Sequence, residues 1–271
     1  MRNLALAALL LVTAAAPGLA QSVAPILTTP EAKDVWTRAR PAEARVTHVD
    51  LALDVDFAKQ TIGGVATLDV LAAKGAKEIV LDTLDLDIAS ITDEKGRTLA
   101  HTLGPKDAEL GSALTVQLNG AKKIRIAYSS KPGARALQWL TPEQTLGKAK
   151  PFLFSQGQAI NNRSWIPTQD SPGIRQTWSA TITVPEGLVT AMSARADTPE
   201  GTPVAGGKRA FRFTMTNPVP PYLIAIAVGD LKFKAIGPRS GVWSEPGMLD
   251  AAVAVFGVVW KMIGASLGRY G

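Results

Sequence analysis

Short segments in which apolar and polar residues alternate recur along most of this chain, and they limit the folds that it can adopt. In the segment HVDLALDVDF (48–57), one face carries Leu51, Leu53, Val55 and Phe57, while a histidine and three aspartates occupy the other. A period of two with one apolar face is typical of a half-buried β-strand. The segment therefore predicts a strand that packs one face on a core and exposes the other.

The same pattern appears in six further segments. They are QTIGGVATLDVLA (60–72), EIVLDTLDLDI (78–88), ALTVQL (113–118), KIRIAY (123–128), TWSATITV (177–184) and RAFRFTM (209–215). The pair Gly63-Gly64 is expected at the bend before its strand, and the apolar segment YLIAIAVG (222–229) predicts a strand covered on both faces. Many short strands separated by turns predict an all-β fold, either a sandwich or a large curved sheet.

The N-terminal residues 1–20 have the layout of a secretory signal peptide. Arg2 precedes an uncharged stretch, 4–16, and small residues stand before an expected cleavage at Gln21. The stretch is shorter than the roughly 18–20 residues that span a bilayer, so we expect no stable membrane anchor. The chain is therefore predicted to be exported, periplasmic or secreted, with residues 21–44 as a leader. It contains no cysteine, so no disulfide supports its core.

The C-terminal residues 247–271 predict one apolar helix. Asp250, Lys261 and Arg269 are its only charged residues. A surface helix normally carries a polar stripe, so a helix this apolar is expected to pack against another element. That element would be a protein partner or a further domain of which this helix is the start.

The positive charge of the chain is spread along the sequence. The formal net charge is +6, and the densest local group is Lys122, Lys123 and Arg125. Nucleic-acid-binding proteins usually gather such residues on one face, so we expect no nucleic-acid partner.

Catalytic and metal-binding motifs are sparse. Neither H-E-x-x-H nor G-x-S-x-G occurs, and the two histidines are His48 and His101. Zinc sites draw mainly on histidine, cysteine and carboxylates. His48 shares a strand face with Asp50, which allows a ligand pair but fits the solvated polar face of an edge strand better. His101 is expected in a loop.

Three aspartates, Asp82, Asp85 and Asp87, allow a calcium site or a pair of acid/base carboxylates. Their spacing lacks the loop glycine of a calcium motif, so a solvated strand end is the preferred interpretation. The residues taken alone therefore predict no complete catalytic apparatus, no metal site and no cofactor in this chain.

A long loop region carries a specific resemblance. The segment ALQWLTPEQTLGKAKPFLFSQGQAINNRSWIPTQDSP (136–172), with TWSATITVPEGLVTAMSA, PYLIAIAVGDL and IGPRSGVWSEP after it, resembles the N-terminal β domain of the M1-family zinc aminopeptidases. The resemblance is to the group that includes leukotriene A(4) hydrolase and aminopeptidase B, over about residues 45–247. It implies a saddle-shaped, mostly antiparallel β domain over 45–246, followed by a helix that begins a zinc-dependent catalytic domain.

The resemblance also implies a site. In the family, the loop that matches Gln156, Gly157, Gln158 and Ala159 lines the active-site cleft near the free amino end of a peptide. Many members carry a glutamate where Gln158 stands, so recognition of the amine would rest more on other carboxylates. The alternative is that the two glutamines form hydrogen bonds at a strand end.

The family's catalytic residues have no counterpart here. The G-x-M-E-N segment, the zinc-binding H-E-x-x-H, the downstream glutamate ligand and the transition-state tyrosine are all absent. We therefore expect this chain to form the substrate wall of a zinc aminopeptidase and to be inactive alone. Zinc would be the cofactor of the full-length members of the family. The alternative is a non-enzymatic exported module that binds peptides or a protein.

Overall fold

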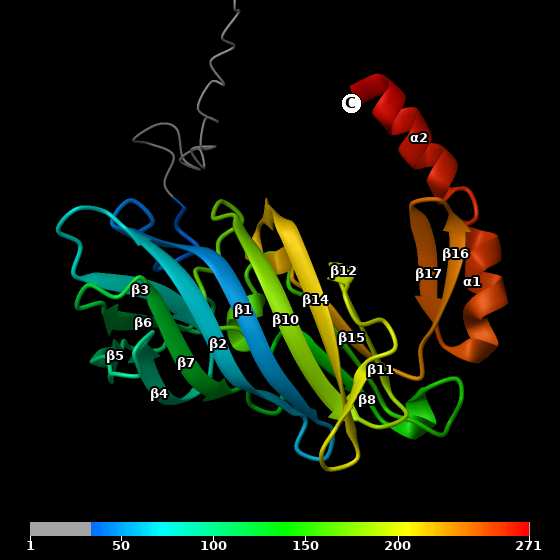
Figure 1. The fold of residues 1–271 in the computed structure, drawn as a ribbon, viewed down its shortest axis with the longest axis horizontal. Coiled ribbons are helices and arrows are strands. Elements are labelled where there is room, and N and C mark those ends of the chain that lie inside the picture. The colour runs from blue at the N-terminus through cyan, green and yellow to red at the C-terminus, as the bar shows by residue number, and fades with distance from the viewer. Residues whose placement is uncertain (1–33, 271) are drawn as a thin grey trace, which may run out of the picture.

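The structure is a computed structural model that describes residues 34–270. The predicted signal peptide and residues 21–33 of the leader lie outside the described residues. Within them, strands dominate and the first α-helix begins at Leu249, so the predicted all-β fold class with a C-terminal helix is confirmed. Figure 1 shows a large curved sheet, with the hairpin of β16 (Lys232–Gly237) and β17 (Ser240–Ser244) and the C-terminal helices at its right-hand end.

The main sheet contains eight strands. In spatial order they are β12 (Arg195–Ala196), β14 (Lys208–Val219), β10 (Gln176–Pro185), β1 (Ala44–Asp56), β2 (Thr61–Ala72), β7 (Lys123–Ser129) and β4 (Asp87–Asp93), with β13 (Thr202–Val204) also pairing with β14. Neighbours are antiparallel except β1 and β10, which run parallel with Leu51 opposite Ala180. Parallel neighbours need a long connection, and here that connection contains the whole β3–β6–β5 sheet, two strands of the four-stranded sheet and the candidate site.

Three smaller sheets complete the β structure. They are β3 (Glu78–Thr83), β6 (Ser112–Gln117) and β5 (His101–Leu103); β11 (Val189–Met192), β15 (Ile226–Gly229), β9 (Phe152–Ser155) and β8 (Leu137–Leu140); and β16 (Lys232–Gly237) with β17 (Ser240–Ser244). Four 3₁₀ turns connect them: η1 (Pro142–Gln144), η2 (Asn162–Ser164), η3 (Pro221–Leu223) and η4 (Pro246–Met248).

The core lies between the main sheet and the smaller sheets. The apolar face predicted for β1 is buried, as are Trp178 of β10 and Trp165 after η2. Burying apolar side chains contributes roughly 25 cal/mol for each Å² removed from water. The alternating pattern is thus the cause of the layered arrangement, because each strand offers one face to this shared core.

Some strand boundaries differ from the sequence predictions. The predicted strand 78–88 is two strands, β3 and β4, in different sheets, and the predicted strand 222–229 is η3 followed by the short β15. His101 was expected in a loop but begins the exposed strand β5. These differences arise because long-range pairing, which local periodicity does not encode, selects the strand ends.

The glycine pair in β2 does not form a bend. Gly63 and Gly64 continue the strand between β1 and β7. Gly64 has φ of +148°, and a Cβ there would lie 2.1 Å from the Ala52 carbonyl oxygen. The expected bend was therefore wrong, and Gly64 is instead required by a close approach of two backbones.

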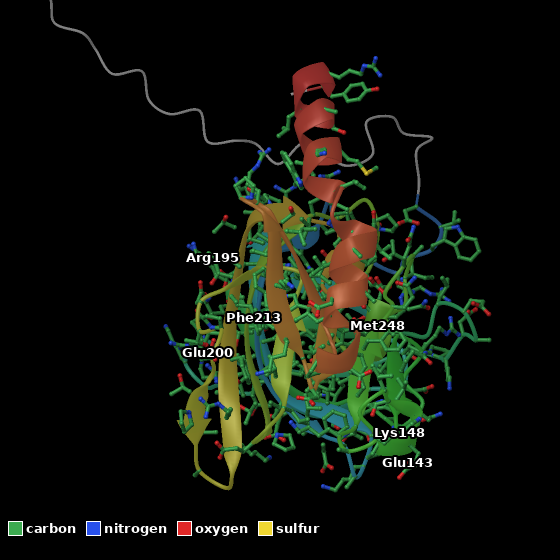
Figure 2. The ribbon with its side chains drawn as sticks, turned by 90° about the vertical axis from the view of Figure 1, so that its right-hand side faces the viewer. Glu143, Lys148, Arg195, Glu200, Phe213 and Met248 are labelled. Atoms are coloured by element: carbon green, nitrogen blue, oxygen red, sulfur yellow. The ribbon has the colours of Figure 1, made fainter. Side chains whose placement is uncertain are left out.

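The C-terminal residues form α1 (Leu249–Phe256) and α2 (Val259–Tyr270), which lie beyond the β16–β17 hairpin (Figure 1). Figure 2 shows Met248 at the start of α1, above the turn that carries Glu143 and Lys148. Lys234 Nζ donates to Asp250 Oδ1 at 2.8 Å. Neither helix buries a residue.

By length and composition, the 25-residue stretch Pro246–Tyr270 would suffice to cross a membrane, with a mean hydropathy of 1.7 over a window of 18 residues. Core helices of soluble proteins have the same length and apolar composition, so these two features do not distinguish a membrane-spanning helix from a helix that packs against protein.

Candidate functional site

The candidate site is the turn that follows β9. It consists of Gln156, Gly157, Gln158 and Ala159. The Gln156 N–H donates to the Ala136 carbonyl at 2.7 Å, and the Asn161 N–H donates to the Gly157 carbonyl at 2.8 Å. These bonds close the turn at both ends, so its side chains are carried on a backbone that is held by neighbouring elements.

The two glutamine side chains of the turn face solvent. Gln156, Gln158 and Ala159 are exposed, and neither glutamine amide has a hydrogen-bond partner among residues 34–270. The alternative of strand-end hydrogen bonding therefore does not describe these side chains. Each amide offers both donors and an acceptor, so the pair presents free hydrogen-bonding capacity at one edge of the small sheet.

Gly157 is buried beneath the two glutamines. A Cβ at this position would lie 2.4 Å from Asn162 Oδ1 and 2.9 Å from the Tyr222 carbonyl oxygen. Any side chain would displace the turn, so glycine is required here by close packing rather than by a positive φ.

Asn162, which the sequence analysis did not identify, joins the turn to the segment around η3. It is fully buried on η2. Its Nδ2 donates to the carbonyls of Pro221 at 2.6 Å and Ile224 at 2.9 Å. Its Oδ1 accepts from Trp165 Nε1 at 2.8 Å. The signal in the sequence was the asparagine pair directly after the turn.

Further hydrogen bonds attach η2 to the core. Ser164 Oγ accepts from the Ala136 N–H at 3.0 Å and donates to the Asn161 carbonyl at 2.7 Å. The buried Tyr128 hydroxyl donates to the Trp165 carbonyl at 2.9 Å. The segment that follows the turn is therefore held by buried groups, which reduces the motion that a bound ligand would have to freeze.

His48 and Asp50 are joined through hydroxyl groups and do not form a metal site. His48 Nδ1 lies 2.7 Å from Thr177 Oγ1, and Nε2 lies 3.2 Å from Ser179 Oγ. Ser179 Oγ donates to Asp50 Oδ1 at 2.6 Å. Burial lowers the pKa of His48. The strand β1 is central, between β2 and β10, so the expected edge strand was wrong.

No group of three or more histidine, cysteine or acidic residues within residues 34–270 could hold a metal ion. The side chains that the structure describes therefore do not fit a zinc centre, which needs at least three protein ligands.

The three aspartates do not share one environment. Asp85 and Asp87 are exposed and pair with Lys106 and Lys131 at 2.8 and 3.0 Å, as expected for a solvated strand end. Asp82 is fully buried, so that interpretation was wrong for this residue. Its backbone N–H donates to the Thr168 carbonyl at 2.8 Å, and its carboxylate accepts hydrogen bonds from other parts of the chain rather than from water.

Asp82 belongs to a buried charge cluster, which we define as Asp82, Arg163 and Asp170. Arg163 Nε lies 3.4 Å from Asp170 Oδ2, and Arg163 Nη2 lies 3.9 Å from Asp82 Oδ2. All three residues are 0% exposed. Desolvation raises the pKa of Asp170 to about 7 and also raises the pKa of Asp82.

The architecture defines a class of protein: a curved β domain with a turn, residues 156–159, that exposes two glutamine side-chain amides. Residues 45–223 match the model of the peptidase M1 N-terminal domain. The chain therefore belongs to the peptidase M1 family of zinc metallopeptidases, and residues 45–223 are its N-terminal domain.

Relatives support this assignment over the same region. Leukotriene A-4 hydrolase of Xenopus laevis is 34% identical over 232 residues, which is 83% of this chain and 38% of that protein. Human aminopeptidase B is 34% identical over 245 residues, covering 82% of this chain and 37% of that protein. The chain thus spans little more than a third of the length of these relatives.

Solved structures agree. The yeast LTA4 hydrolase in complex with bestatin superposes with a TM-score of 0.75 and 31% identity, over 85% of this chain and 36% of that one. An M1 zinc metallopeptidase from Deinococcus radiodurans shares the fold. It superposes with a TM-score of 0.57 and 22% identity, over 74% of this chain and 46% of that one.

Proposed function

We propose that this chain forms one wall of a peptide-binding site, as the N-terminal domain of a zinc aminopeptidase that removes N-terminal residues from peptides. The observation that carries the proposal is the turn 156–159, whose two glutamine amides are exposed and free of internal hydrogen bonds. A peptide backbone has both donors and acceptors, and primary amides match both.

We propose further that the chain has no peptidase activity alone. The described residues supply no zinc ligand set, and amide hydrolysis in this class depends on a metal ion that activates water. The test is an assay of the purified chain with zinc and aminoacyl anilides. Turnover that is abolished by a chelator would contradict the proposal.

Peptide binding is tested by calorimetric titration with a short peptide that has a free amino terminus. Gln158→Ala is expected to weaken binding by about 2- to 13-fold, the effect of one hydrogen bond worth about 0.5–1.5 kcal/mol. Gln138→Ala is the matched control, because Gln138 is an exposed glutamine on β8 outside the turn. Equal losses in both variants, or no binding by the parent chain, would refute a wall formed by the turn.

The second candidate function is a non-enzymatic exported module, periplasmic or secreted, with a protein partner at the C-terminal helix. The observation that favours it is the exposure of large apolar residues on α1 and α2, including Val255 at 70% and Met262 at 62%. Exposed apolar patches often mark interfaces. Export is tested by mass spectrometry of the N-terminus, with cleavage before Gln21 expected.

A further inference from the structure

The first described residues, 34–40, form a segment that lies against the buried charge cluster, and we call it the N-terminal strap. Thr37 Oγ1 donates to Asp82 Oδ2 at 2.5 Å, and the Arg38 N–H donates to Asp82 Oδ1 at 2.8 Å. Ser171 Oγ donates to the Asp34 carboxylate. The strap is therefore held mainly by polar bonds to the buried carboxylate and its surroundings.

Arg163 connects the strap to the second carboxylate. Its Nη2 donates to the Trp36 carbonyl at 2.8 Å and to the Asp170 carbonyl at 2.7 Å, and its Nη1 donates to the Leu110 carbonyl at 2.8 Å. One guanidinium thus faces two carboxylates in a site without exposure to water. With both carboxylates ionised the cluster would carry a net negative charge, which is costly in a low-dielectric interior.

The two carboxylates differ in how well they are satisfied. Asp82 accepts from Thr37, Arg38 and the Asp170 N–H, which lies at 3.0 Å. Asp170 accepts only from Arg163, at Oδ2, and its Oδ1 is buried without a partner among the described residues. Hydrogen bonds stabilise the ionised form of Asp82, so the proton of the cluster resides on Asp170.

The other charged groups near the strap do not neutralise the cluster. Arg38 lies 3.8 Å from Asp107, and both side chains are nearly half exposed. Arg40 pairs with Glu43 and Glu78 at the surface. Asp34, at the start of the strap, adds negative charge. Arg163 is thus the only cation, among residues 34–270, that pairs with the two buried carboxylates.

We propose that the N-terminal strap is a proton-controlled conformational device, closed while the buried cluster holds one proton and open when that proton is lost to solvent. Loss of the proton leaves two ionised carboxylates and one cation in the cluster, and opening of the strap lets water reach Asp82 and Arg163, the members that it contacts. Opening sacrifices little apolar burial, because Val35 and Trp36 are already 63% and 57% exposed. Burial raises the pKa of Asp170 to about 7, so the change is centred near neutral pH.

The test uses a nitroxide spin label on the strap. The chain has no cysteine, so Val35→Cys provides a single attachment site at an exposed position. Spectra of the labelled chain from pH 5.5 to 8.5 report the mobility of the strap. We expect a mobile component that grows with pH, with a midpoint near 7. An unchanged line shape over this range would overturn the proposal.

Variants identify the group that titrates. Asp170→Asn is permanently neutral, so we expect an immobile strap at every pH. Asp85→Asn is the matched control at an exposed aspartate, and it should retain the midpoint. Thr37→Val removes one bond to Asp82 and should increase mobility at every pH. The same midpoint in the Asp170→Asn chain would overturn the proposal, and so would loss of the midpoint in the Asp85→Asn chain.

Discussion

Replacing Arg163 with methionine tests whether the buried charge cluster holds the domain together. The substitution keeps much of the side-chain volume but leaves Asp82 and Asp170 buried without a cation, and it removes the bonds to the carbonyls of Trp36 and Leu110. Breaking a buried ion pair on one side typically costs about 3–5 kcal/mol. We therefore expect the free energy of unfolding to fall by about this amount at pH 5, where the strap is closed.

The expected loss depends on pH. At pH 5, Asp170 is protonated in the folded parent and in the variant, because its pKa of about 7 lies above that pH. The strap is then closed, and the variant leaves the Asp82 carboxylate buried without its cation. At pH 8 the strap is open and water reaches the cluster, so the loss should be smaller there. Urea unfolding at both pH values, followed by tryptophan fluorescence, measures the difference, since Trp165 and Trp178 are fully buried reporters.

The control is Arg195→Met. Arg195 pairs with Asp197 at 2.8 Å, but its side chain is 73% exposed, and exposed ion pairs contribute only about 0–1 kcal/mol. The reasoning is refuted if Arg163→Met costs less than about 1 kcal/mol at pH 5. It is also refuted if the two variants lose the same stability, because burial would then have no influence on the cost.

Three further predictions follow from other parts of the structure. Because the pKa of Asp170 is raised to about 7 in the folded chain against about 3.9 when unfolded, the folded state binds more protons between these values. The contribution of Asp170 to the free energy of unfolding is therefore fully present below pH 4 and is lost as the pH rises to 7, by up to about 4 kcal/mol. Asp170→Asn should remove this part of the pH dependence of urea unfolding. Gly64→Ala should destabilise the chain by about 3 kcal/mol or more, because the added Cβ would lie 2.1 Å from the Ala52 carbonyl oxygen and the backbone must shift. Thermal melting compares the variant with the parent chain, and an unchanged Tm would argue against this packing. Asn162→Ala should cost about 2–4 kcal/mol, since it removes one of two bonds to the Pro221 carbonyl and leaves the Ile224 carbonyl and the Trp165 side-chain N–H without their partner. Gln158→Ala should change the free energy of unfolding by less than about 0.5 kcal/mol, and equal losses in urea unfolding would contradict the description of the turn.

The strand content was predictable from the sequence because the signal is local. From Val49 in β1 and from Trp178 in β10 every second residue is apolar, and the structure buries those residues. Each strand follows its own pattern whatever its partner, since side chains alternate across any sheet. The turn 156–159 was found through its resemblance to a family, and the exposure of its glutamines required the structure.

The positions that sequence reasoning assigned wrongly depend on contacts between distant parts of the chain. The local sequence predicts Asp82 as a surface aspartate. Its carboxylate is buried instead, and it accepts from the Thr37 hydroxyl and from the backbone N–H groups of Arg38 and Asp170. Gly64 reads as a turn residue, but its neighbour across the sheet makes it necessary. Neither partner is visible in the local sequence.

The sequence by itself determined that the chain forms strands with one apolar face, because the period of two is a property of neighbouring residues. It also determined family membership, through long ordered segments. The tertiary structure decided which strands pair, where β3 ends, and which polar groups leave water. Those outcomes depend on chain segments more than 40 residues apart, such as Thr37 and Asp82, that meet only when the core forms.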